Sequence, residues 1–184
     1  MKTQFVIILA VASLICQAHG GVKEAFAAKE RGDYETARKE FQALADKGEA
    51  KAMIELGLMY HTGDGVKQDY GKAMDRYLKA FAKGNGDAYS NIGVMYRDGL
   101  GCETNRPIAY ALFYITHMSG LGSESTQYRA GRNLDKTAAL MKSEAIEETL
   151  KMTEKYVLTF VEKHGKLYEK DKALMFSKEH HTLR

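Results

Sequence analysis

Tryptophan, proline, cysteine and a dominant charge are what this sequence lacks. It has no Trp, one Pro and two Cys in 184 residues, and its 27 Lys and Arg are nearly balanced by 24 Asp and Glu. This balance provides no basic field for nucleic acid, so we expect no nucleic-acid partner. The scarcity of proline and the absence of Trp favour helix over strand.

Long apolar runs are also scarce, and the one present lies near the start of the chain. It extends from Phe5 to Ile15 after a positive charge, and Ala18 and Gly20 place small side chains where a signal peptidase reads. This order predicts a secretory signal peptide over residues 1–20 and export, with the bacterial periplasm as the expected location. The run is shorter than the ~20 residues that a membrane span needs, and no second run follows.

The two cysteines have different expected fates. Cys16 lies in the signal peptide after Ile15, whereas lipid attachment normally needs Gly, Ala or Ser there, so a lipid anchor is the less favoured alternative. Cleavage leaves Cys102 alone and excludes an internal disulfide. We expect Cys102 to pack as a small hydrophobe, with an intermolecular disulfide as the alternative.

A 36-residue repeat is the strongest internal feature of the sequence. A shift of 36 from the segment that begins at Ala50 pairs Ala52 with Ala88, Leu56 with Ile92, Gly57 with Gly93, Met59 with Met95, Gly63 with Gly99, Ala73 with Ala109, Tyr77 with Phe113 and Gly84 with Gly120. The opposite shift recovers only the second half of the unit. We therefore expect a partial capping repeat at 21–49, a first full repeat at 50–85 and a degenerate second one at 86–121.

Each unit has the pattern of two helices joined by a glycine loop. Gly63 and Gly99 end the first helices at positive φ, and Asp33, Asp69 and Asn105 stand as N-caps of the second helices. Glycine inside the first helices, as at Gly93, predicts the close approach of a neighbouring helix backbone. The predicted fold class is all-α, an α-solenoid of antiparallel helix hairpins.

The remaining sequence predicts closing helices at 122–163 and a C-terminal helix and tail at 164–184. Ser143 is expected to cap a helix with Glu144 in its first turn. His164 and Gly165 predict its end. Its apolar face would comprise Ile146, Leu150, Thr153, Val157, Phe160 and Val161.

The pattern A-x-A-x-x-x-L-G-x-x-Y-x-x-G-x-G-V-x-x-D-Y-x-K-A from Ala50 to Ala73 resembles the Sel-one-like repeat, a short relative of the tetratricopeptide repeat. The segment G-D-Y-E-T-A-R-K-E-F from Gly32 to Phe41 resembles the opening half-unit of small exported bacterial members. The resemblance covers residues 22 to 155 and departs from the pattern at Cys102 and Ile108, where the first unit has Val66 and Lys72.

No pattern of catalytic or metal-ligating residues accompanies the repeat. The glycine loop after Gly63 lacks the G-x-x-x-x-G-K-[ST] phosphate motif, and no G-x-S-x-G elbow occurs. His180 and His181 could bind a metal, but two neighbouring histidines without further ligands are usually only solvated. We expect no catalytic residue, no cofactor and no metal site.

Stacked helix hairpins offer a face that suits protein binding. We therefore expect a non-catalytic adaptor, monomeric or weakly oligomeric, whose partner is another protein. By analogy with tetratricopeptide proteins, first-helix residues would line the concave face: Ile54, Leu58, His61, Ser90, Val94 and Arg97. His61 and Arg97 are expected to lie outside the packing stripe.

The resemblance leaves finer readings of the function open. Relatives act in envelope assembly, motility, host interaction and neutralisation of secreted toxins, so an immunity protein or inhibitor is one reading. A secreted host-interaction factor is another. A weak hydrolase of the β-lactamase type is a third, although the relatives described so carry a cysteine pair in every repeat, which this chain lacks.

Overall fold

The computed structural model describes residues 21–164, with side chains up to Lys155. This part of the chain is built from helices and contains no strand, which confirms the predicted all-α class. None of its helices is long and apolar enough to cross a membrane. The expected signal peptide, His180, His181 and the expected C-terminal helix lie outside the described residues.

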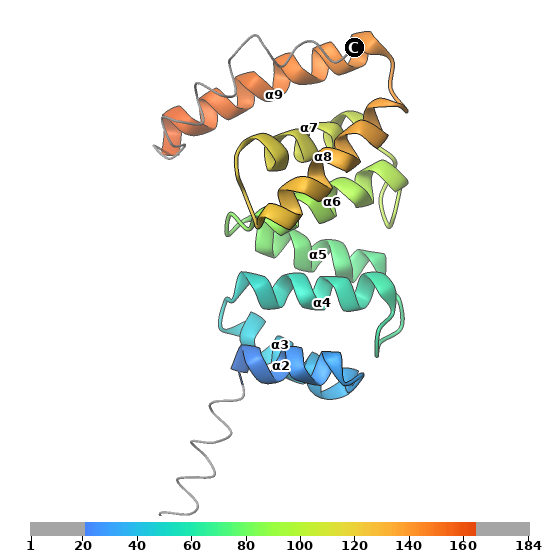
Figure 1. Cartoon of the computed structure of the whole chain (residues 1–184), viewed down its shortest axis with the longest axis vertical. Helices are drawn as coiled ribbons and strands as arrows, with labels where there is room; N and C mark the ends of the chain where they lie inside the picture. The colour runs from blue at the N-terminus through green and yellow to red at the C-terminus, as the bar shows by residue number, and fades with distance from the viewer. Residues whose placement is uncertain (1–20, 165–184) are drawn as a thin grey trace, which may run out of the picture. The chain divides into compact units, whose positions relative to one another are not determined.

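The first compact unit extends to Arg76. It contains α2 (Gly21–Glu30), α3 (Tyr34–Asp46), α4 (Ala50–Thr62) and the first half of α5 (Tyr70–Phe81). In this unit α2 packs on α3, and α3 packs on α4 (Figure 1). Its core includes the fully buried Phe41, Leu56 and Met59, and the Phe26 ring meets the Phe41 ring edge-on at 5.2 Å.

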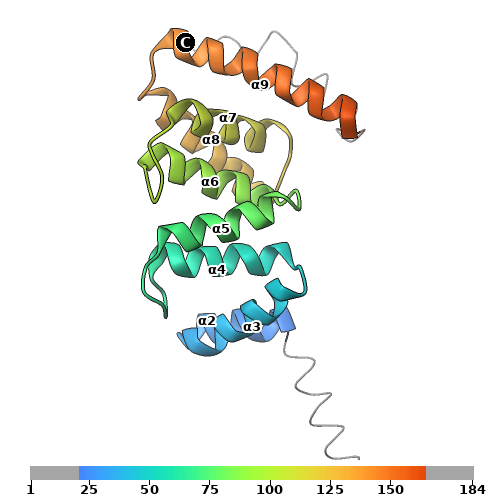
Figure 2. The same ribbon diagram turned by 180° about the vertical axis from the view of Figure 1, so that it is seen from behind.

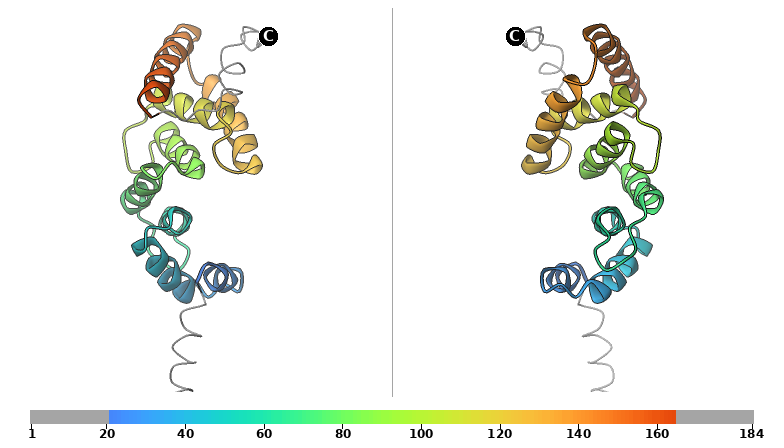
Figure 3. Two further views of the ribbon diagram at one scale, coloured as in Figure 1. Left: turned by 90° about the vertical axis from the view of Figure 1, so that its left-hand side faces the viewer. Right: turned by 90° about the vertical axis from the view of Figure 1, so that its right-hand side faces the viewer.

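The second compact unit begins at Tyr77. It contains the rest of α5, then α6 (Gly86–Asp98), α7 (Arg106–Met118), α8 (Glu124–Ala138) and α9 (Ser143–His164). Helix α7 is its central element, because α6, α8 and α9 all pack against it (Figures 2 and 3). Helix α8 also packs on α6. The aromatic side chains of Tyr77 and Phe113 are fully buried in this unit.

The helix ends follow the sequence prediction closely. Gly63 and Gly99 end α4 and α6 in the left-handed conformation, with φ of 85° and 69°. The side chains of Asp33, Asp69 and Asn105 each accept a hydrogen bond from the backbone N–H three residues later, at 2.9 to 3.1 Å. These caps satisfy N–H groups that the first helical turn leaves without partners, which is why each second helix begins there.

The predicted close approach at Gly93 involves a different partner from the one expected. A Cβ added to Gly93 would lie 2.8 Å from Cε1 of Phe113, so the helix makes room for an aromatic ring and not for a backbone. A true backbone approach occurs at Gly86, where an added Cβ would lie 2.2 Å from the backbone nitrogen of Gly122. Glycine therefore serves ring packing inside α6 and backbone packing at its start.

Helix α9 departs from the prediction in two details. Its first helical residue is Ser143, and the Lys142 carbonyl accepts from the Ile146 N–H at 3.1 Å, so Ser143 lies one residue past the cap position. The buried positions are Thr149 and Thr153, whereas Ile146 and Leu150 are only half-buried. Threonine can be buried here because each hydroxyl donates to the carbonyl four residues earlier, at 2.6 and 2.7 Å. The side chains of Val157, Phe160 and Val161 lie outside the described set.

Candidate functional site

The six residues expected to bind a partner fall at three positions of the repeat register, each pair separated by 36 residues. The first pair is Ile54 and Ser90, whose exposed fractions are 4% and 5%. These two side chains, on α4 and α6, are buried and present almost no surface to a partner. The second pair, Leu58 and Val94, is half-buried and keeps an accessible apolar edge.

The third pair begins with His61, which lies in the last turn of α4 and contacts the loop that joins α4 to α5. Its ring meets the Tyr70 ring edge-on at 5.5 Å, and its carbonyl accepts from Nε2 of Gln68 at 2.8 Å. The side chain of His61 is half-buried. It therefore holds the end of α4 against the start of α5 as well as offering surface.

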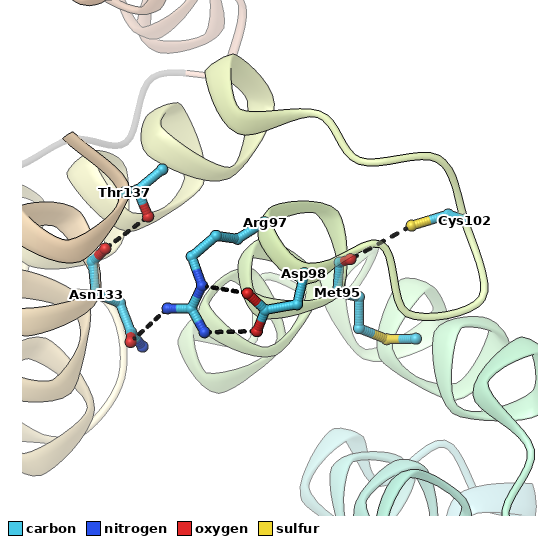
Figure 4. A network of polar contacts seen from close by, with 6 residues as sticks. All are labelled: Met95, Arg97, Asp98, Cys102, Asn133 and Thr137. Carbon is cyan, nitrogen blue, oxygen red and sulfur yellow. Dashed lines mark hydrogen bonds and ion pairs between the residues drawn. The ribbon is translucent and has the colours of Figure 1, made fainter. Parts of the chain in front are cut away.

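The third pair ends with Arg97, whose guanidinium lies at the centre of a polar network between α6 and α8 (Figure 4). Its Nε and Nη2 donate to the two carboxylate oxygens of Asp98, at 2.7 and 2.6 Å. Its Nη1 donates to Oδ1 of Asn133 on α8 at 2.9 Å. The guanidinium carbon also lies 5.8 Å from the centre of the Phe113 ring. The arginine thus joins three helices of the second unit.

These contacts correct the expectation that Arg97 lies outside the packing stripe. Its side chain is only 14% exposed, and most of its donors are engaged within the chain. The hydrogen bonds with Asp98 raise the pKa of Arg97 above its ordinary value, so the guanidinium stays charged while it donates to Asn133. The sequence did contain a signal for this contact, because Asn133 follows Arg97 by one repeat length of 36 residues.

A row of partly or fully exposed residues runs along each first helix beside the predicted positions. In α4 and in α6 the row has an aliphatic residue in its middle and polar residues around it, at positions that differ by 36. Its members are Lys51, Glu55, Leu58 and Thr62 in α4, and Asp87, Asn91, Val94 and Asp98 in α6. We call these residues the first-helix row.

Contacts to neighbouring helices hold part of the first-helix row in place. Glu55 accepts from Nζ of Lys29 on α2 at 2.6 Å, and the Nζ of Lys51 lies 4.9 Å from the centre of the Phe26 ring. In the second unit, Asp87 accepts a hydrogen bond from the hydroxyl of Thr126 on α8. The sequence-based prediction did not include these polar residues of the first-helix row, because it was based on the apolar positions of the helices. The same 36-residue shift nevertheless relates Lys51 to Asp87 and Glu55 to Asn91.

Cys102 lies in the loop after α6. Its Sγ approaches the Met95 carbonyl at 3.6 Å as a donor, and the side chain is half-buried (Figure 4). Burial raises the pKa of this thiol, which disfavours the nucleophilic thiolate. Within residues 21–164, no group of three or more His, Cys, Asp or Glu side chains is arranged to hold a metal ion.

Comparison with known proteins identifies the repeats. The family model of the Sel1 repeat matches residues 50–85 and 86–115. No match was found among curated protein sequences.

Solved structures match over most of the chain. One is a protective antigen present in uropathogenic Escherichia coli strains that displays an SLR fold, with 24% identity and a TM-score of 0.61 over 77% of this chain and 28% of the antigen. Another is a Sel1 repeat protein from Oxalobacter formigenes, with 26% identity and a TM-score of 0.47 over 73% of this chain and 56% of that one. The chain thus spans little more than a quarter of the antigen's length. The likeness to the antigen confirms the α-solenoid of helix hairpins.

Proposed function

We propose that this chain, which belongs to the Sel1-like repeat family through its repeats at 50–85 and 86–115, is an adaptor that binds another protein. The first-helix row residues of α4 and those of α6 each provide contact surface on their own unit. Sel1 repeats generally form non-catalytic scaffolds for protein interaction. The observation that supports this surface is the recurrence of an accessible aliphatic residue, Leu58 and Val94, among polar neighbours at equivalent positions of both repeats.

The residues around that aliphatic centre suit a protein interface. Interfaces combine an apolar centre with a polar rim that sets orientation and excludes mismatched partners. Glu55 and Asp87 are held in place by Lys29 and Thr126, so the rim is partly organised before binding. Organisation of this kind reduces the conformational entropy lost on association.

A matched pair of substitutions tests the proposal. The partner is first isolated with the full-length chain as bait from an envelope extract of the source bacterium, and its affinity is then measured by titration calorimetry. Leu58→Glu should weaken binding by about 1 to 3 kcal/mol, because it puts a charge into the apolar centre. Leu78→Glu makes the same chemical change at a residue of α5 that is 48% exposed and outside the row, and it should leave affinity unchanged. Equal effects of both changes would refute the surface assignment.

Export to the bacterial periplasm is part of the proposal, and the signal-peptide pattern of residues 1–20 supports it. The chain purified from a periplasmic fraction should begin at Gly21 when its amino terminus is sequenced. A chain that retains Met1 and stays in the cytoplasm would contradict export.

An immunity or inhibitor role is a narrower form of the proposal, and the resemblance to toxin-neutralising relatives supports it. A periplasmic partner that arrests growth should be neutralised when this chain is produced with it. Protection should be lost with Leu58→Glu and kept with Leu78→Glu. If the partner is instead a non-toxic component of the envelope, the adaptor proposal still holds and the immunity role is excluded.

A further inference from the structure

An open apolar groove lies between α7 and α9 of the second unit, on elements other than those of the first-helix row. Its volume is about 440 Å³. Apolar side chains and two threonines line it: Pro107, Ile108, Ala111, Leu112, Ile115, Thr149, Met152 and Thr153. Ile108 and Met152 are 42% and 55% exposed, so large apolar side chains remain in contact with solvent on both walls.

The way in which α9 packs explains why the groove stays open. Helix α9 approaches α7 through the short, buried side chains of Thr149 and Thr153. Met152 projects from the same helix but lies beside that contact and remains exposed. Exposed apolar surface of this kind is unfavourable in water and marks an interaction site when it is contiguous.

Positive charge stands at one end of the groove. A second cavity of about 450 Å³ shares Pro107 with the first and is lined by Arg106, together with Thr104, Asn105, Leu140, Met141 and Ala145. Arg106 is exposed, and no ion pair joins it to any residue in the described part of the chain. It begins α7, where the helix dipole adds further positive potential. Among the described residues, no carboxylate lines either cavity.

We propose that this groove binds an amphipathic helical segment of a partner protein, with its apolar side chains against Ile108 and Met152 and a carboxylate of the segment beside Arg106. The lining residues of α7 run from Pro107 to Ile115, which is about 12 Å along the helix. That length accommodates about two turns of a docked helix, whose apolar anchors at i, i+3 or i+4, and i+7 match the groove. The guanidinium of Arg106 forms no ion pair with a described residue, and it sets the direction of the segment because it favours an acidic end there.

A display selection with the full-length chain as target tests both features of the partner. The library contains amphipathic helical peptides whose terminal residues are randomised, and it is depleted beforehand on the bare support without the chain. Selected peptides should carry Asp or Glu at one end, and fluorescence anisotropy should show about tenfold weaker binding to Met152→Glu. Arg106→Gln should remove the preference for an acidic over an amide end without abolishing binding. Tyr128→Glu, an exposed position on α8 outside the groove, should have no effect.

Four outcomes would overturn the proposal. Selected peptides without enrichment of Asp or Glu at one end would refute the role of Arg106. Binding that neither Met152→Glu nor Ile108→Glu weakens would show that the groove is not the binding site. A concentration-dependent dimer in sedimentation that Met152→Glu dissociates would show that a second copy is the occupant. Peptide binding that emerges only after removal of residues 165–184 would show that the chain itself fills the groove. Leu58→Glu affects only the first-helix row, so failure here is distinguishable from failure of the proposed function.

Discussion

Gly93 illustrates how a single residue sets the distance between two helices. The Phe113 ring, fully buried, occupies the space that a side chain at this position would need. Gly93→Val should therefore destabilise the chain by about 2 to 4 kcal/mol, because the branched side chain forces the ring or the helix to move. Thermal and urea unfolding followed by circular dichroism measure the change.

Gly71→Ala is the matched control. Gly71 lies in the first turn of α5, and an added Cβ would meet only Oδ1 of Asp69 at an ordinary 3.4 Å. The substitution should be neutral or stabilising by up to about 1 kcal/mol, since alanine loses less conformational entropy in a helix. A Gly93→Val variant that melts like the Gly71→Ala variant would show that the ring contact is not tight.

The N-caps give the chain a predictable response to acid. Hydrogen bonds from Thr36 lower the pKa of Asp33, and hydrogen bonds from Lys72 lower the pKa of Asp69, both from an ordinary value of 3.8. A carboxylate whose pKa is lower in the folded chain stabilises that fold above the unfolded pKa, and the contribution is lost as the pH falls through the folded value. The expected window is therefore below pH 3.8.

Replacing both aspartates by asparagine should keep the caps and remove this dependence. Asn105 already caps α7 in the same chain, so the Tm of Asp33→Asn/Asp69→Asn should change little at neutral pH. Below pH 3.8 the variant should lose less Tm than the parent chain. Asn105→Asp is the converse control and should steepen the acid response. Superimposable Tm profiles for all three chains would contradict the cap assignment.

At the scale of helices, the contact of Arg97 with Asn133 is expected to couple α6 to α8. Hydrogen bonds to a charged group contribute about 1.5 to 3 kcal/mol where they are shielded from water, and less where solvent reaches them. Arg97→Gln and Asn133→Ala should each lower the free energy of unfolding by about 1 to 2 kcal/mol. The double variant should lose less than the sum of the single effects, by about 0.5 kcal/mol or more. Strict additivity in a double-mutant cycle would show that the two side chains do not interact.

The same contact changes how the binding surface should be probed. A charge reversal at Arg97 disturbs α6, α7 and α8 together, so its effect on a partner cannot be separated from its effect on stability. Leu58 and Val94 are the better probes because they belong to the accessible row and make no such polar network.

At the scale of the whole chain, α9 acts as the terminal cover of α7. A chain that ends after Met141 retains α8 but exposes more of the apolar side chains of Ile108, Leu112 and Ile115 along α7, which already line an open groove. Terminal capping elements keep repeat proteins soluble. The shortened chain should therefore form oligomers or aggregates in size-exclusion chromatography, while circular dichroism still shows helix. A soluble monomer of undiminished Tm would indicate that α9 is an independent addition.

The sequence alone determined the features that depend on residues close together in the chain. Glycines at positive φ and the Asp and Asn caps were predictable because a turn or a cap involves atoms only a few residues apart. The 36-residue period was predictable because it is a repetition within the sequence itself. The six candidate binding residues were correctly assigned to first helices for the same reason.

Tertiary structure alone decided which faces of the helices are used. It buried Ile54 and Ser90, joined Arg97 to Asn133, placed the Phe113 ring beside Gly93 and turned Thr149 and Thr153 of α9 toward α7. Helical spacing identifies an apolar stripe but not the helix that covers it, nor the angle at which it does so. Those choices depend on how side chains far apart in the sequence fit together, and the same fit left the groove between α7 and α9 open.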